Sequence, residues 1–238
     1  MLLKIKNEKM ESSSNVGDGG MATDFFHFRL PNLLVIVGSS QAGKSVLASE
    51  IVKANREIIR PTPQVIIWVY TIWQEDLFKK IRERTPGVIF CNGMDEFNKI
   101  ELSKSVNHLV VLDDCMTCVS DSSEMVNLFT RKIHHFNIFL IYLAQTLYMK
   151  SKYNTLIQRQ AGYVILFENK RNNYEANHFG REVNLKPSDI KYLFRDAAKY
   201  LKRPYILFVC VPETDEQRSM LIHFLPHQHP KFFYYISD

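Results

Sequence analysis

The segment that most constrains the fold is 33–52, where an apolar run leads into a glycine-rich turn and then into a stretch with helical spacing. Residues 38–45 read GSSQAGKS and match the pattern G-x-x-x-x-G-K-S/T. Gly38 and Gly43 let the backbone curl until successive N–H groups point inward around phosphate oxygens. A strand before such a loop and a helix after it form the context in which this pattern binds nucleotide phosphates.

The loop residues have distinct expected contacts with a nucleotide. Lys44 can reach the β- and γ-phosphates, and the Ser45 hydroxyl can ligate Mg²⁺. The helix that begins at about Lys44 adds the positive end of its dipole. The residues expected to bind ATP are Gly38, Ser39, Ser40, Gln41, Ala42, Gly43, Lys44 and Ser45.

Apolar runs typical of buried strands alternate with helical segments along the rest of the chain. Strands are expected at 33–37, 65–70, 87–90, 108–112, 137–143, 163–167 and 205–209, and helices at 44–59, 74–84, 95–105, 122–133, 149–159, 172–182 and 187–201. This alternation indicates an α/β fold with a mostly parallel central sheet and helices on both faces. We predict a single P-loop domain over residues 23–238, preceded by a flexible polar leader over residues 1–22.

Two acids and one amide follow predicted strands. Asp113, at the end of the run 108–112, fits an aspartate that holds Mg²⁺ directly or through water. Asp114 stands where many ATPases have a glutamate that polarises the attacking water, although its side chain is shorter. Gln145 would reach the γ-phosphate or that water if the strand 137–143 neighbours the other two. The alternative for each residue is an ordinary polar side chain at a strand end.

An oligomeric ATPase also needs a cation that stabilises transition-state charge on the nucleotide of a neighbouring subunit. Arg131, near the end of the predicted helix 122–133, is the catalytic candidate, and Arg159 and Arg171 are alternatives. The default reading of each is a surface arginine. The sequence alone therefore leaves the choice among the three open.

Charge, apolar runs and cysteine spacing bear on possible partners, on membrane segments and on metal sites. A net charge of +5 and a pI of about 8.9 are compatible with a nucleic-acid partner but do not demonstrate one. No apolar run approaches the ~18 residues of a membrane span, and no signal peptide is evident, so we expect an intracellular protein. Cys115 and Cys118 form a lone C-x-x-C without the second pair that a zinc site needs, and we expect reduced thiols.

Five segments together resemble the FtsK–HerA superfamily, and within it the poxvirus-type DNA-packaging ATPases of large DNA viruses, virophages and Polinton (Maverick) elements. They are 38–45, 112–114, 131–138, 141–148 and 163–171. In that group a His-His pair, an asparagine and a strand ending in Q-N/T-L-F/Y recur together. Here these are His134, His135, Asn137 and the run 145–148. The chain departs from the group at Lys170 and Asn172, where the group has a proline and an acid.

The resemblance implies a RecA-like ATPase that works as a homo-oligomeric ring, in that group hexameric. Such a ring uses ATP and Mg²⁺ to move double-stranded DNA into a preformed capsid, with a capsid or portal protein as partner. It would act in the host cell, in the nucleus or a cytoplasmic virus factory, and could remain with the virion. Two other functions stay open: a small P-loop kinase, and a scaffold that binds nucleotide and assembles capsid or replication partners without productive hydrolysis.

Overall fold

The computed structural model describes residues 3–8, 26–115, 123–148, 159–171, 173–211, 220–228 and 231–236. Within these ranges the strands are β1 (Leu3–Glu8), β2 (Phe28–Arg29), β3 (Asn32–Val37), β4 (Ile59–Arg60), β5 (Val65–Tyr70), β6 (Ile89–Asn92), β7 (His108–Asp113), β8 (Ile138–Ala144), β9 (Ala161–Phe167), β10 (Tyr205–Val209), β11 (Met220–Ile222) and β12 (Lys231–Ile236). The helices are α1 (Lys44–Lys53), α2 (Asn55–Ile58), α3 (Glu75–Arg84), α4 (Gly93–Phe97), α6 (Ser123–Asn127), the π-helix η1 (Leu128–Lys132), α7 (Ile133–His135), α9 (Tyr174–Glu182) and α10 (Pro187–Ala197).

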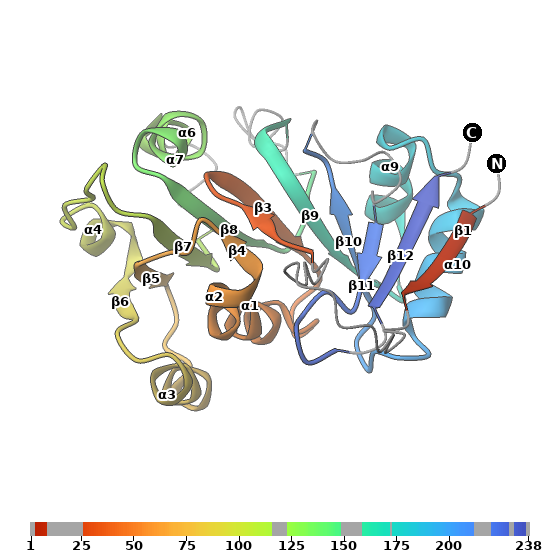
Figure 1. Ribbon diagram of the computed structural model, residues 1–238, viewed down its shortest axis with the longest axis horizontal. Coiled ribbons are helices and arrows are strands. Elements are labelled where there is room, and N and C mark those ends of the chain that lie inside the picture. The colour runs from red at the N-terminus through yellow and green to blue at the C-terminus, as the bar shows by residue number, and fades with distance from the viewer. Residues whose placement is uncertain are drawn as a thin grey trace, which may run out of the picture.

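Ten of these strands form one sheet in the order β1-β12-β11-β10-β9-β3-β8-β7-β5-β6 (Figure 1). The six strands from β9 to β6 are parallel, whereas the four neighbouring pairs from β1 to β9 (β1–β12, β12–β11, β11–β10 and β10–β9) are antiparallel. The predicted α/β fold with a mostly parallel central sheet is confirmed. Strand β3, which precedes the glycine-rich loop, lies between β8 and β9 near the middle of this sheet.

The connections explain why helices cover both faces. From β3 the chain steps outward to β5 and β6, and these connections carry α1 and α3. It then steps back through β7 to β8, and these connections carry α4, α6, η1 and α7. Because crossovers between parallel strands are right-handed, opposite directions of travel place helices on opposite faces. The core divides accordingly: Leu34 and Ile36 of β3 pack with α1–α3, whereas Leu33 and Val35 face the other helices.

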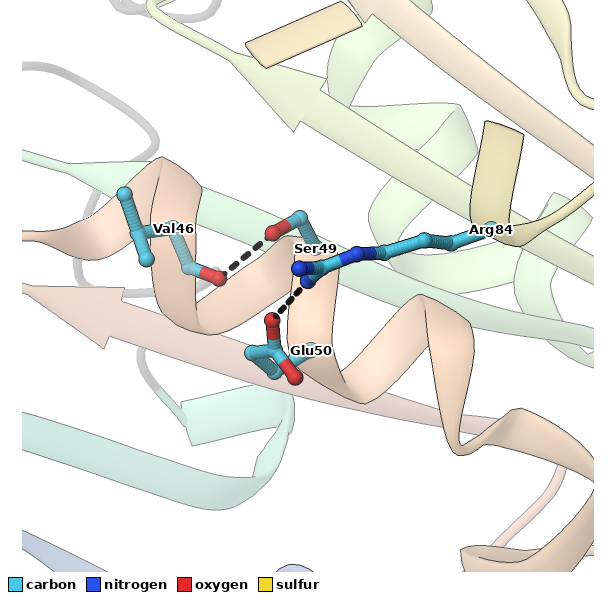
Figure 2. Close-up of polar contacts among 4 residues, drawn as sticks. All are labelled: Val46, Ser49, Glu50 and Arg84. Atoms are coloured by element: carbon cyan, nitrogen blue, oxygen red, sulfur yellow. Dashed lines mark hydrogen bonds and ion pairs between the residues drawn. The ribbon is translucent and has the colours of Figure 1, made fainter. Parts of the chain in front are cut away.

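Helix α1 is positioned mainly by its apolar face. Its buried residues are Leu47, Ala48, Ile51 and Val52. On the exposed side, Arg84 at the end of α3 donates to Glu50 Oε1 over 2.8 Å, and the Ser49 hydroxyl donates to the Val46 carbonyl over 2.7 Å (Figure 2). Ion pairs as exposed as Arg84–Glu50 contribute at most ~1 kcal/mol. Burial of the apolar face therefore fixes the helix that follows the loop.

Several predicted elements change their boundaries. The helix expected at 95–105 is α4, which ends at Phe97, so the prediction is wrong beyond that residue. The strand expected at 87–90 is β6 and begins two residues later, at Ile89. The helix expected at 122–133 is present as α6, η1 and α7. The helix expected at 149–159 lies almost entirely outside the described residues.

Part of the predicted flexible leader forms a strand of the sheet. Leu3–Glu8 form β1, which pairs antiparallel with β12 at one edge of the sheet. In this segment Leu3 and Ile5 alternate with Lys4 and Lys6, a period-two pattern typical of a strand. Residues 9–25, the rest of the predicted leader, lie outside the described ranges.

Two further expectations concern thiols and membrane spans. Cys115 is buried beside the end of β7 and forms no disulfide, as predicted, whereas Cys118 lies outside the described residues. In the part of the chain that the structure describes, no helix has the length and apolarity needed to cross a membrane.

Candidate functional site

A cavity of about 450 Å³ opens at the carboxyl ends of β3, β8 and β7. Its polar lining includes Lys44, Ser45, Asp113, Asp114, Gln145 and Arg203. Because carboxyl ends of neighbouring parallel strands meet at one edge of a sheet, segments far apart in sequence converge here. The structure thus places five of the sequence-predicted side chains around one space large enough for a small ligand.

The loop between β3 and α1 needs both glycines for steric reasons. Gly43 has φ +105°, in the left-handed region, and precedes the first residue of α1. A Cβ at Gly38 would lie 2.9 Å from the Cβ of Phe167 on β9, closer than packed carbon atoms approach. Gln41 also has positive φ, at +63°. The backbone is therefore curled over the end of the sheet as the sequence pattern predicts.

Lys44 lies across this loop. Its Nζ donates to the carbonyl oxygens of Gly38, at 2.7 Å, and Ser39, at 3.1 Å. Burial lowers the pKa of Lys44, and the charges of Asp113 and Asp114 partly oppose that effect. A partly desolvated ammonium group is stabilised by nearby negative charge. A phosphate group in the cavity would supply that charge.

Ser45 and Asp113 form a pair of oxygen donors. The Ser45 hydroxyl donates to Asp113 Oδ1 over 3.0 Å. Asp113 is only 5% exposed, and its Oδ2 has no hydrogen-bond partner within the described residues. A buried carboxylate oxygen without a partner is costly, and oxygen ligands suit Mg²⁺, which binds through one or two carboxylates together with phosphates and water. The two residues therefore fit the predicted magnesium site.

Burial also dominates the titration of Asp113. It raises the pKa of this carboxyl to about 6 from an ordinary 3.8; the Ser45 hydrogen bond, the charge of Lys44 and the nearby Trp68 indole N–H, which is outside normal hydrogen-bond geometry, oppose the rise, and the charge of Asp114 adds to it. The folded state therefore binds a proton more tightly than the unfolded chain does. Stability contributed by this group is fully present below pH 3.8 and is lost as the pH rises through 6.

We therefore expect the Asp113→Asn variant to become more stable than wild type as the pH rises. Since each pKa unit is equivalent to ~1.4 kcal/mol, the free energy of unfolding of wild type should fall by ~2 kcal/mol relative to the variant between pH 4 and pH 7. Urea unfolding of both proteins across this range measures the difference. Asp76→Asn, at an exposed site on α3, is the matched control and should run parallel to wild type. A constant gap between wild type and Asp113→Asn would contradict the expectation.

Asp114 and Gln145 both lie at the rim of the cavity. Asp114 is exposed, follows β7 with φ +57°, and its carbonyl accepts a hydrogen bond from the Thr71 hydroxyl over 3.3 Å. Gln145 directly follows β8 and is exposed. Strand β8 lies between β3 and β7, which is the arrangement that the sequence hypothesis for Gln145 requires. Both side chains are placed where they could contact water beside a bound phosphate.

The three candidate arginines are dispersed. Arg131 is exposed on η1 and lines a separate cavity near the amino end of β8. The glycine-rich loop lies at the other end of the strands, where their carboxyl ends meet. Arg159 lines another cavity, near the amino ends of β3 and β9. Arg171 lines a cavity of about 590 Å³ beside loop residues 39–42. Within its own subunit, Arg131 is therefore not part of the cavity that holds Lys44.

Sequence reasoning missed Arg203, which lines both the first cavity and the 590 Å³ cavity beside it. The residue lies just before β10, a strand that was expected but whose direction was not. Because β10 runs antiparallel to β9, its first residues reach the edge where the parallel strands end. The sequence does show the basic pair Lys202–Arg203 just before an apolar run. This pair points to the cavity only once β10 is known to run antiparallel to β9.

Comparisons with known proteins give similarities of fold only. No protein-family profile and no curated protein matches the chain. The genome-packaging NTPase B204 from Sulfolobus turreted icosahedral virus 2, in complex with ATP-gammaS, is 16% identical over 77% of this chain and 95% of its own, with a TM-score of 0.48. B204 from Sulfolobus turreted icosahedral virus, a DNA-packaging ATPase, is 15% identical over 87% and 98%, with a TM-score of 0.47. The flagellar accessory protein FlaH from Methanocaldococcus jannaschii is 13% identical over 58% and 72%, with a TM-score of 0.43. We draw no functional conclusion from similarities at this level.

Proposed function

We propose that the chain is a Mg²⁺-dependent ATPase, and that its hydrolysis of ATP drives double-stranded DNA into a preformed capsid. The observation that carries the ATPase part is the convergence of Lys44, Ser45 and Asp113 on one cavity, with Asp114 and Gln145 at its rim. These groups supply what nucleotide hydrolysis requires: a phosphate cradle, oxygen ligands for the metal, and polar groups for the attacking water.

Each residue has a stated task in this proposal. The N–H groups of the loop and the Lys44 ammonium bind the phosphates, while Ser45 and Asp113 would hold Mg²⁺. When bound, Mg²⁺ would neutralise charge on the phosphate oxygens. Asp114 accepts the proton of the attacking water, and Gln145 orients that water toward the γ-phosphate. The products are ADP and inorganic phosphate.

The DNA-packaging part of the proposal rests on the sequence resemblance, which is most specific in the block 134–148. Arg131 lies away from the cavity of its own chain, so any action on a nucleotide would have to be on that of a neighbouring subunit in a homo-oligomeric ring. The net charge of +5 is compatible with DNA as the transported polymer, since translocases hold the phosphate backbone by charge rather than by reading bases. A capsid or portal partner and action inside a host cell follow from the same resemblance.

Steady-state ATP hydrolysis with and without double-stranded DNA tests the proposed function. We expect Mg²⁺-dependent turnover that DNA stimulates several-fold, and Lys44→Ala measures any contaminating ATPase. Turnover that depends on a small phosphate acceptor would identify a kinase instead. Nucleotide binding without turnover, unaffected by replacement of Asp114, would favour the scaffold. A rate indifferent to DNA would contradict the translocase.

A further inference from the structure

Arg203 occupies an unusual position beside the glycine-rich loop. It lies between α10 and β10 and lines both the cavity that contains Lys44 and the cavity beside residues 39–42. A Cβ built at Gly43 would be 2.9 Å from Arg203 Nη1 and 3.1 Å from its Cδ. The guanidinium group therefore lies beside Gly43, the residue just before α1, and helix N-termini are places where backbone N–H groups can bind an anion.

The cavity also holds a second cation beside Lys44. Its lining contains two carboxylates, Asp113 and Asp114, and two cations, Lys44 and Arg203. Arg203 therefore adds positive charge to the space in which the negative phosphates of a nucleotide would lie. Within the described residues, no hydrogen bond or ion pair engages the Arg203 side chain. Its five N–H donors are available to a ligand.

We propose that Arg203 binds phosphate oxygens of the nucleotide held by its own chain, an inference that rests on the ATPase function proposed above. It would act in cis, in contrast to the role proposed for Arg131 on a neighbour's nucleotide. The planar guanidinium group can donate two parallel hydrogen bonds to one phosphate, which a lysine ammonium cannot reproduce. Because Gly43 has no side chain, the guanidinium group can lie close to the backbone of the loop.

Replacement of Arg203 by alanine and by lysine tests this assignment, with Lys202→Ala as the matched control. Lys202 is the adjacent cation and lines the 590 Å³ cavity but not the cavity that contains Lys44. We expect Arg203→Ala to weaken binding of a fluorescent ATP analogue by about tenfold to a hundredfold, the usual effect of losing hydrogen bonds to a charged group. Arg203→Lys should recover only part of this loss, and Lys202→Ala should bind within about twofold of wild type. Equal losses in Arg203→Ala and Lys202→Ala, or none in either, would overturn the proposal.

A mixing experiment tests whether Arg203 acts within its own chain. Arg203→Ala subunits retain Lys44, and Lys44→Ala subunits retain Arg203. If Arg203 acts in cis, a mixture of the two hydrolyses ATP no faster than the separate proteins together. Recovery of turnover in the mixture would show that Arg203 serves a neighbour. A wild-type chain without turnover would refute the ATPase instead, and the binding measurement would still decide whether Arg203 contacts the nucleotide.

Discussion

The Asp113→Asn variant is expected to hydrolyse ATP at least ~1,000-fold more slowly than the wild-type chain, because a metal at the reacting phosphate supplies several kcal/mol of charge stabilisation. Asparagine keeps an oxygen that can accept the Ser45 hydrogen bond, so the local geometry should survive. What it loses is the negative charge on an oxygen that has no protein partner among the described residues. The rate is measured at saturating ATP over a range of Mg²⁺ concentrations.

This variant separates catalysis from folding. It should be inactive at neutral pH and, from the raised pKa of Asp113, more stable than wild type. Asp76→Asn again serves as the control and should retain full turnover. A rate for Asp113→Asn within about tenfold of wild type at saturating Mg²⁺ would remove Asp113 from the metal site.

The second large effect is expected at Asp114, where Asp114→Asn should slow turnover by about 100-fold to 10,000-fold while nucleotide affinity changes little. A general base acts on the attacking water and contributes little to ground-state binding, so the loss should appear in kcat rather than in KM. Asparagine tolerates positive φ nearly as readily as aspartate, so the backbone at +57° should persist.

Asp114→Glu provides the informative comparison. It restores the carboxylate with a longer side chain, which is the length that many related sites use, and we expect it to retain substantial activity. If Asp114→Asn turns over at the wild-type rate, another group accepts the proton. If Asp114→Asn and Asp114→Glu are equally impaired, the rate depends on the exact position of the carboxylate at residue 114 as well as on its presence. Single-turnover measurements with saturating enzyme distinguish these outcomes from slow product release.

Most of the phosphate site could be predicted from sequence because its parts are local. The glycines at 38 and 43 are required by backbone conformation, and Asp113 and Gln145 each follow an apolar run directly. In a parallel sheet such residues all lie at the carboxyl ends of their strands. The convergence on a single cavity follows from the order of β3, β8 and β7, which no local pattern specifies.

The features that the sequence did not predict depend on hydrogen bonds between strands far apart in the chain. The direction of β10 is set by its hydrogen bonds to β9. An apolar run of five residues does not indicate whether the strand pairs parallel or antiparallel with its neighbour. Arg203 was missed for that reason. Strand β1 was read as part of a leader because its partner, β12, lies at the other end of the chain. The predicted helix 95–105 was wrong beyond Phe97, where Ile100 and Leu102 pack against the core without continuing the helix.

Strand β8 has a consequence for how subunits of a ring would communicate. All seven of its residues are buried, and it is hydrogen-bonded to β3 on one side and β7 on the other. One end follows the helical segment that carries Arg131, and the other leads directly into Gln145. Close-packed interiors are poorly compressible and transmit displacement. In the proposed ring, a displacement at the Arg131 end of β8 would therefore be transmitted through this packed strand to Gln145 at the rim of the cavity, which would couple one proposed ATP site to the next.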